Sequence, residues 1–73
     1  MADLNVLSEV TGTAWKIVVT EGQKVAEDDD LMIAESMKME IPLAAPEDGT
    51  VKKICVEEGA QIQEGEVLFI LDV

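Results

Sequence analysis

The chain has 73 residues, a length that fits one small domain with a core close to the lower limit for folding alone. Sixteen acidic residues against five lysines give a net charge of −11, which disfavours nucleic acid and anionic membranes as partners. There is no histidine and one cysteine, so an internal disulfide, a cysteine-based zinc site and most general-base or nucleophile constellations are excluded.

The composition also narrows the class of protein. A hydrophobic content of 48% is ordinary for a folded domain, and no apolar run approaches the ~20 residues needed to span a bilayer. The N-terminus has no charged-then-apolar signal pattern, so a cytoplasmic setting is expected. With so few catalytic residue types, we expect a carrier, binding or structural domain rather than an enzyme, and no metal site.

In chain order, the predicted elements are short strands separated by turn signals. The expected strands of the first half are 4–7, 13–19, 24–26 and 30–36. Those of the second half are 41–44, 50–56, 61–63 and 67–73, with turns at 57–59 and 64–66. Val51, Ile54 and Val56 do not share one alternating parity, which predicts a bulge near Lys52.

The strand pattern recurs because the chain is an internal repeat. Shifting the sequence by 37 positions aligns 4–36 with 41–73 without a gap, and 10 of the 33 pairs are identical, where chance gives about two. Eight short strands in two similar halves predict an all-β fold, a flattened barrel or sandwich of two four-stranded antiparallel sheets with a quasi-two-fold axis. Residues 1–73 form one domain in this interpretation.

Helix is the competing prediction for 31–40, "LMIAESMKME", which is rich in Leu, Met, Ala, Glu and Lys. Its counterpart in the second half is "LFILDV" at 68–73, which has the composition of a strand. The repeat therefore favours a strand over a helix.

Residues 37–40 belong to neither half and join the last strand of one to the first strand of the other. A tight hairpin is expected there, and the two-fold relation puts it at the end of the molecule opposite the termini. Two-residue hairpin turns favour Asn-Gly or Asp-Gly because their central residues need φ > 0. Met37 and Lys38 are poor turn residues, and such strain is typical of functional sites.

The segment Glu35-Ser36-Met37-Lys38-Met39 resembles the biotin-attachment motif, usually Glu-Ala-Met-Lys-Met, of the biotinyl/lipoyl attachment domain family. "GTAWKIVVTEGQKV" before it and "APEDGTVKKICVEEGAQIQEGEVL" after it match the family pattern, so the resemblance covers almost the whole chain. It implies a flattened barrel of two four-stranded sheets with the modified lysine on a hairpin turn. Serine replaces the usual alanine at position 36, a change between two small residues.

The resemblance implies a biotin carboxyl carrier domain with biotin on Lys38. A biotin protein ligase activates biotin as its adenylate, and the lysine amine attacks the activated carbonyl to form an amide. A biotin carboxylase then carboxylates the tethered biotin, and a carboxyltransferase passes the carboxyl group to an acceptor such as acetyl-CoA, propionyl-CoA or pyruvate. An exposed lysine amine is protonated at neutral pH, so the ligase must help remove its proton.

Each candidate site residue also has a plain structural interpretation. Lys38 could be one more solvated lysine, although the motif and its place between the repeats favour attachment. Met37 and Met39 are expected to mark the site for the ligase, with partial packing against the barrel end. Glu35 is either a ligase contact or part of the acidic surface. Trp15 aligns with Lys52, so we expect it to face outward, where a partner can reach it.

Two rival functions stay open at this point. Lipoylation of Lys38 keeps the fold and changes the cofactor, but lipoyl domains usually place Asp-Lys-Ala at this turn. An unmodified structural or docking β domain leaves the Met-Lys-Met segment unexplained. Neither the acceptor of a parent carboxylase nor a choice between a stand-alone protein and a fragment follows from these residues.

Overall fold

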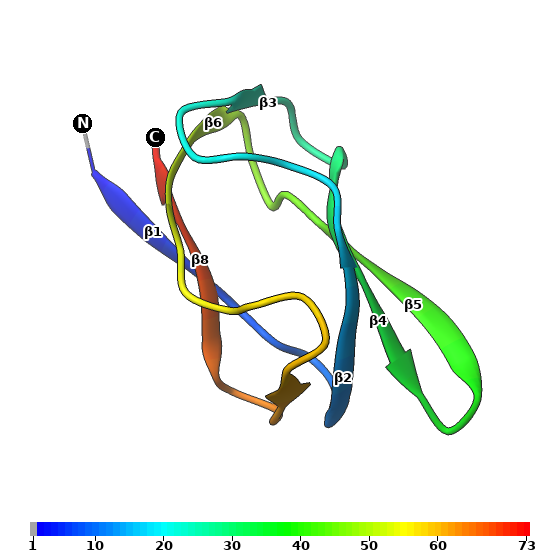
Figure 1. The fold of residues 1–73 in the computed structure, drawn as a ribbon. Coiled ribbons are helices and arrows are strands. Elements are labelled where there is room, and N and C mark those ends of the chain that lie inside the picture. The colour runs from blue at the N-terminus through cyan, green and yellow to red at the C-terminus, as the bar shows by residue number, and fades with distance from the viewer. Residues whose placement is uncertain (1) are drawn as a thin grey trace.

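A computed structural model of the chain describes residues 2–73, in which eight strands are the regular elements (Figure 1). They are β1 (Asp3–Leu7), β2 (Gly12–Ile17), β3 (Lys24–Val25), β4 (Asp30–Ser36), β5 (Met39–Ala44), β6 (Gly49–Ile54), β7 (Gln61–Ile62) and β8 (Val67–Asp72). The order follows the predicted one, and 31–36 is strand rather than helix. The described residues contain no helix with the length and hydropathy of a membrane span.

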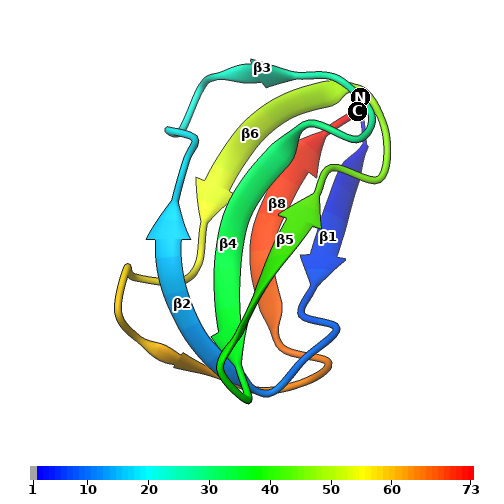
Figure 2. The ribbon, with the colours of Figure 1, turned by 90° about the vertical axis from the view of Figure 1, so that its right-hand side faces the viewer.

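The strands form two four-stranded antiparallel sheets, ordered β1-β8-β6-β3 and β5-β4-β2-β7. Each four-stranded sheet takes two strands from each half of the repeat, so neither half completes a sheet without the other. The shift of 37 residues carries the first order into the second, which is the predicted quasi-two-fold relation. The predicted fold class is therefore confirmed, as an open sandwich whose two sheets do not close into a barrel (Figure 2).

Both long inner strand pairs carry a bulge at equivalent positions. The register of β6 against β8 shifts between Val51 and Lys53, which confirms the bulge predicted near Lys52. The register of β2 against β4 shifts between Ala14 and Lys16, at Trp15. Because a bulge inserts one residue, the apolar side chains before and after it can both face the core.

Side chains from both sheets fill the space between them. The largest fully buried ones are Phe69, Leu31, Met32, Ile62, Leu68, Leu71 and Val51. Burying an apolar side chain of this size contributes about 1.5–3 kcal/mol relative to leaving it exposed. The core thus consists of aliphatic residues around a single phenylalanine, as a chain with one Phe and one Trp requires.

Candidate functional site

A two-residue turn, Met37-Lys38, connects β4 to β5, and the pair Ser36 and Met39 closes it. Met37 has φ of 53° and Lys38 has φ of 65°, so both adopt the left-handed conformation expected of this turn. The turn is shorter than the four residues that separate the repeats. Met39 and Glu40 begin β5, because the strand pairing continues up to Ser36 on the opposite strand.

The turn concentrates backbone strain in this small domain. Among residues 2–73, only Asp28, Met37 and Lys38 combine a side chain with positive φ. Asp28, at 74°, takes the place that Gly65 has in the second half, at 88°. Met37 and Lys38 have no repeat counterpart, and the turn they form carries strain of about 1–3 kcal/mol. Asn-Gly would adopt this conformation at lower cost, so stability alone does not explain Met37 and Lys38 at this turn.

The base of the hairpin is held by the loop between β1 and β2. The Ser36 Oγ donates a hydrogen bond to the Thr11 carbonyl oxygen, at 2.8 Å. A Cβ at Gly12 would collide with the Glu35 carbonyl oxygen, so glycine is what lets β2 approach β4 this closely. Ser36, which stands where the family motif usually has alanine, therefore has a structural role through its hydrogen bond to Thr11. The identical pair Gly12 and Gly49 was the one sequence signal of this close approach.

The side chains of the turn extend into solvent. Met37 is 92% exposed and Met39 is 64% exposed, so the packing predicted for them is wrong for Met37 and slight for Met39. The reason is that the hairpin leans away from the sheet that contains β1 and β8 (Figure 1). Lys38 is exposed, and within residues 2–73 the one ion pair joins Lys52 to Asp3. The Lys38 amine is therefore exposed and forms no ion pair within residues 2–73.

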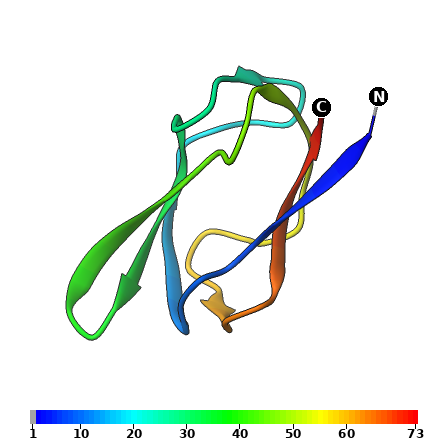
Figure 3. The ribbon, with the colours of Figure 1, turned by 180° about the vertical axis from the view of Figure 1, so that it is seen from behind.

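The hairpin and the chain termini lie at opposite ends of the molecule, as Figures 1 and 3 show. Ala2 and Val73 pair through two backbone hydrogen bonds, with N–O distances of 3.0 and 2.9 Å. The repeat makes this pair the counterpart of Met39 and Ser36. The turn Met37-Lys38 is thus at the far end from the termini, and it projects without obstruction from the rest of the chain.

Glu35 and Glu40 face each other across the hairpin as a directly paired couple of β4 and β5. Both carboxylates are exposed. They stand next to the turn, where a protein that reaches Lys38 meets them. The predicted role of Glu35 in recognition stays a prediction, as do those of Met37 and Met39.

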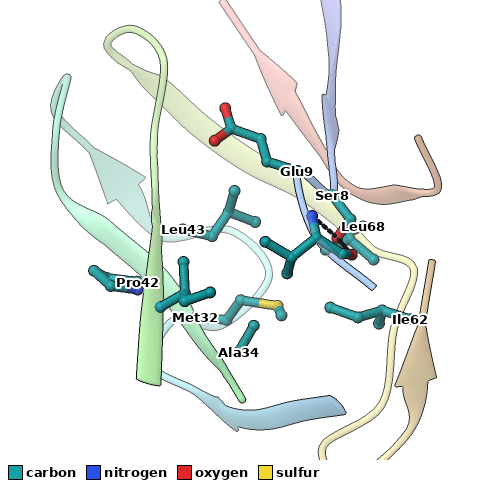
Figure 4. A pocket seen from close by; sticks show the side chains of 10 residues that line it. Ser8, Glu9, Met32, Ala34, Pro42, Leu43, Ile62 and Leu68 are labelled. Atoms are coloured by element: carbon teal, nitrogen blue, oxygen red, sulfur yellow. Dashed lines mark hydrogen bonds between the residues drawn. The ribbon is translucent and has the colours of Figure 1, made fainter. Parts of the chain in front are cut away.

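A small cavity lies between β4, β5 and the β1–β2 loop (Figure 4). Met32 and Ala34 line it, where the second half has the larger Phe69 and Leu71. Its volume is about 20 Å³, which is room for about one water molecule and none for a cofactor ring. A cofactor attached to Lys38 therefore cannot bind in this cavity.

The acidic run 28–30 stands at a turn that leads into β4. The Asp29 carboxylate accepts a hydrogen bond from the Ala26 amide at 2.9 Å, within a turn. No group of three or more potential ligand side chains gathers anywhere in residues 2–73.

Comparisons with known proteins extend this picture. Residues 4–71 match a protein-family model described as "Biotin-requiring enzyme". The chain is 38% identical over 68 residues to a biotin/lipoyl attachment protein of Bacillus subtilis (strain 168), a match that covers 93% of either chain. It has the same identity over 68 residues to the pyruvate carboxylase of that organism, of which it spans 6%.

A solved structure, the urea carboxylase of Kluyveromyces lactis, contains a region similar to this fold. The TM-score is 0.91 at 30% sequence identity, covering 99% of this chain and 6% of that one. The chain is therefore similar over most of its length to a small attachment protein and to one segment of each of two much larger carboxylases.

Proposed function

This chain belongs to the biotin/lipoyl attachment family, and on that basis we propose that it is a carrier domain with biotin joined covalently to Lys38. The observation that carries the assignment of the residue is the turn itself. Lys38 stands at the centre of the family motif, on a strained two-residue turn, with an exposed amine that forms no ion pair within residues 2–73.

The chemistry of attachment fits this side chain. The neutral Lys38 amine attacks the carbonyl carbon of biotin activated as an acyl adenylate. The C–N amide bond forms, the C–O bond to AMP breaks, AMP leaves and the nitrogen gives up a proton. A primary amine that projects from a tight turn can enter a narrow active site, because only Met37 and Met39 accompany it. When bound, biotin supplies a ring nitrogen that accepts and gives up a carboxyl group.

The shape of the domain fits a carrier. The short strands and bulged sheets form a rigid base, and the attachment turn lies at the end away from Ala2 and Val73 (Figure 3). A chain or linker that continues from the termini would leave the turn free to visit separate active sites. Tethering in this way raises the effective concentration of the cofactor at each site.

The partners in this proposal are a biotin protein ligase, a biotin carboxylase and a carboxyltransferase. The relatives named pyruvate carboxylase and urea carboxylase support carboxylase partners, while the acceptor depends on subunits other than this one. The domain itself is non-catalytic in this scheme. Its lack of histidine and the exposure of its reactive lysine are consistent with a substrate of enzymes.

Lipoyl attachment at the same lysine is the second candidate, because the name of the Bacillus subtilis relative covers both cofactors. The methionines on both sides of Lys38 favour biotin. The two groups differ in mass, so one measurement separates them.

The test is co-expression of the chain with a biotin protein ligase and, separately, with a lipoyl ligase, followed by intact-mass spectrometry and streptavidin blotting. We expect one biotinyl group on the parent chain and none on a Lys38→Arg variant. Lys53→Arg is the matched control and should be labelled like the parent. Addition of lipoyl alone supports the second candidate, and no addition of either group refutes the carrier function.

A further inference from the structure

Trp15 and Lys52 are equivalent positions of the two halves, and they differ in charge. In the sheet that contains β1, β8 and β6, the Lys52 amine contacts both carboxylate oxygens of Asp3, at 2.9 and 3.1 Å. The hydrogen bond and the charge of Asp3, and then the charge of Asp72, raise the pKa of Lys52. The shift of 37 residues puts Trp15 in the place of Lys52, and Glu40 and Glu35 in the places of Asp3 and Asp72.

The strand pairing confirms that these positions are structurally equivalent. Lys52 and Trp15 each lie in the bulge of an inner strand, which pairs with the other inner strand of its sheet. Asp3 pairs with Asp72 across β1 and β8, and Glu40 pairs with Glu35 across β5 and β4. Figure 2 shows β2, β4 and β5 side by side, in the arrangement that β6, β8 and β1 have in the other sheet.

The hairpin side therefore keeps the acids and lacks the cation that neutralises them. Neither Glu35 nor Glu40 forms an ion pair with any residue between 2 and 73. Lys16 is on the same strand as Trp15, but it pairs with Ile33, farther from the turn than Glu35, and within the described part of the chain it has no ion-pair partner. Trp15 is 47% exposed in a position where the other half has a long polar side chain.

An exposed tryptophan beside two unneutralised carboxylates is complementary to a basic side chain. An arginine or lysine can lie over the indole face, in a cation–π contact, while its charge meets a carboxylate. Tryptophan is also enriched among the residues that dominate the binding energy of protein interfaces. The same two acids flank the turn that carries Lys38, so a protein that acts on this lysine has to cover them.

We propose that Trp15, Glu35 and Glu40 form a docking surface for a basic side chain of the enzyme that attaches biotin. The inference rests on the proposed function, since it assigns the partner of that same turn. Docking at this surface lowers the KM for the carrier without taking part in the chemistry at the Lys38 amine. Salt screens the electrostatic attraction between the two carboxylates and the basic side chain of the ligase.

The other half of the molecule provides the variants that test this proposal. Trp15→Lys reproduces the arrangement of Lys52 and Asp3, neutralises Glu40 and removes the indole, in a position that accepts lysine elsewhere in the same fold. Glu40→Gln removes one acid alone. Lys52→Met and Asp3→Asn are the matched controls at the far end, and thermal unfolding verifies that every variant is folded.

The measurement is steady-state ligation of biotin by a purified biotin protein ligase, at low and at high salt. For Trp15→Lys we expect KM to rise about tenfold with kcat within about twofold of the parent, and the salt dependence of KM to weaken. Glu40→Gln should show a smaller rise, and the controls none. A parent labelled on Lys38 together with an unchanged KM for Trp15→Lys would overturn the docking surface alone. A parent that accepts no biotin would overturn the proposed function and this inference with it.

Discussion

Val73 and Ala2 form reciprocal backbone hydrogen bonds, and they occupy the positions that Ser36 and Met39 occupy at the other end of the molecule. Of the two positions that the quasi-two-fold axis interchanges, one is therefore closed by a turn and the other is left open as the two termini. The residues that close it, Met37 and Lys38, have no counterpart in the repeat. The position that interrupts the symmetry is the one at which we place attachment.

The strain of the turn is testable by a double substitution, Met37→Asn with Lys38→Gly. Because Asn and Gly adopt φ > 0 at little cost, we expect stability to rise by about 1 kcal/mol. That corresponds to an increase in Tm of about 4–8 °C for a domain of this size. Asp28→Gly, at the other non-glycine residue with positive φ, should give a smaller gain. A lower Tm for the double variant would show that the turn is not strained.

Gly12 is predicted to be essential for the base of the hairpin. A Cβ there meets the backbone of Glu35, so Gly12→Ala should destabilise the domain by about 1–3 kcal/mol and reduce the rate of biotin ligation. Gly49→Ala is the matched control, because its Cβ meets the Asp72 carbonyl oxygen at 2.8 Å, away from the turn. It should lower the Tm but leave ligation of the folded protein unchanged. Equal loss of ligation in both variants would contradict a local role for Gly12.

The cavity beside β4 predicts a stabilising substitution. Ala34→Val adds two carbon atoms at the cavity wall. The equivalent position of the second half holds the larger Leu71, so the substitution should increase the free energy of unfolding by about 1 kcal/mol. Ala14→Val makes the same chemical change at a fully buried site that does not line this cavity, and overpacking should destabilise it. Urea unfolding with an unchanged m-value measures both effects. If both variants lose stability, the space beside Ala34 cannot accept a side chain.

The ion pair of Lys52 with Asp3 predicts a weak dependence of stability on pH in the alkaline range. The folded state raises the pKa of Lys52, so its contribution is complete below the ordinary lysine value of about 10.4 and is lost as pH rises through the folded-state pKa. The difference in Tm between the parent and Lys52→Met should be small at pH 7, because both partners are more than half exposed. It should vanish above that pKa. A difference that grows with pH would have the wrong sign for this pair.

Much of this architecture could be predicted because the repeat carries information twice. The match of "GTAWKIVVTEG" to "GTVKKICVEEG" gave strand positions, the pairing of the halves and the bulge near Lys52. Local composition alone predicts a helix for "LMIAESMKME". The same alignment predicts a strand instead, and Asp30–Ser36 is a strand in the structure. The poor turn residues Met37 and Lys38 predicted a strained turn, and the positive φ of both residues agrees with that prediction.

What the sequence could not supply are features that depend on the distance between backbones. The identical pair Gly12 and Gly49 indicates a position that needs glycine, but it does not identify Glu35 as the neighbour of Gly12. The hydrogen bond from Ser36 to Thr11 likewise joins segments far apart in the chain. The cavity arises from the sum of several side-chain volumes, which no single position reveals. The packing expected for Met37 was wrong, because it depended on how the hairpin lies relative to the other sheet, and the hairpin leans away from it.

The most direct test of the central claim is to locate the modification by mass spectrometry of proteolytic peptides after ligation with a biotin protein ligase. The chain has five lysines, all exposed, so the location of biotin decides the matter. We predict a single biotinyl group on the peptide that contains Met37, Lys38 and Met39, and none on the others. Biotin at Lys16, Lys24, Lys52 or Lys53, or a chain that stays unmodified, would contradict the assignment of Lys38 as the attachment site.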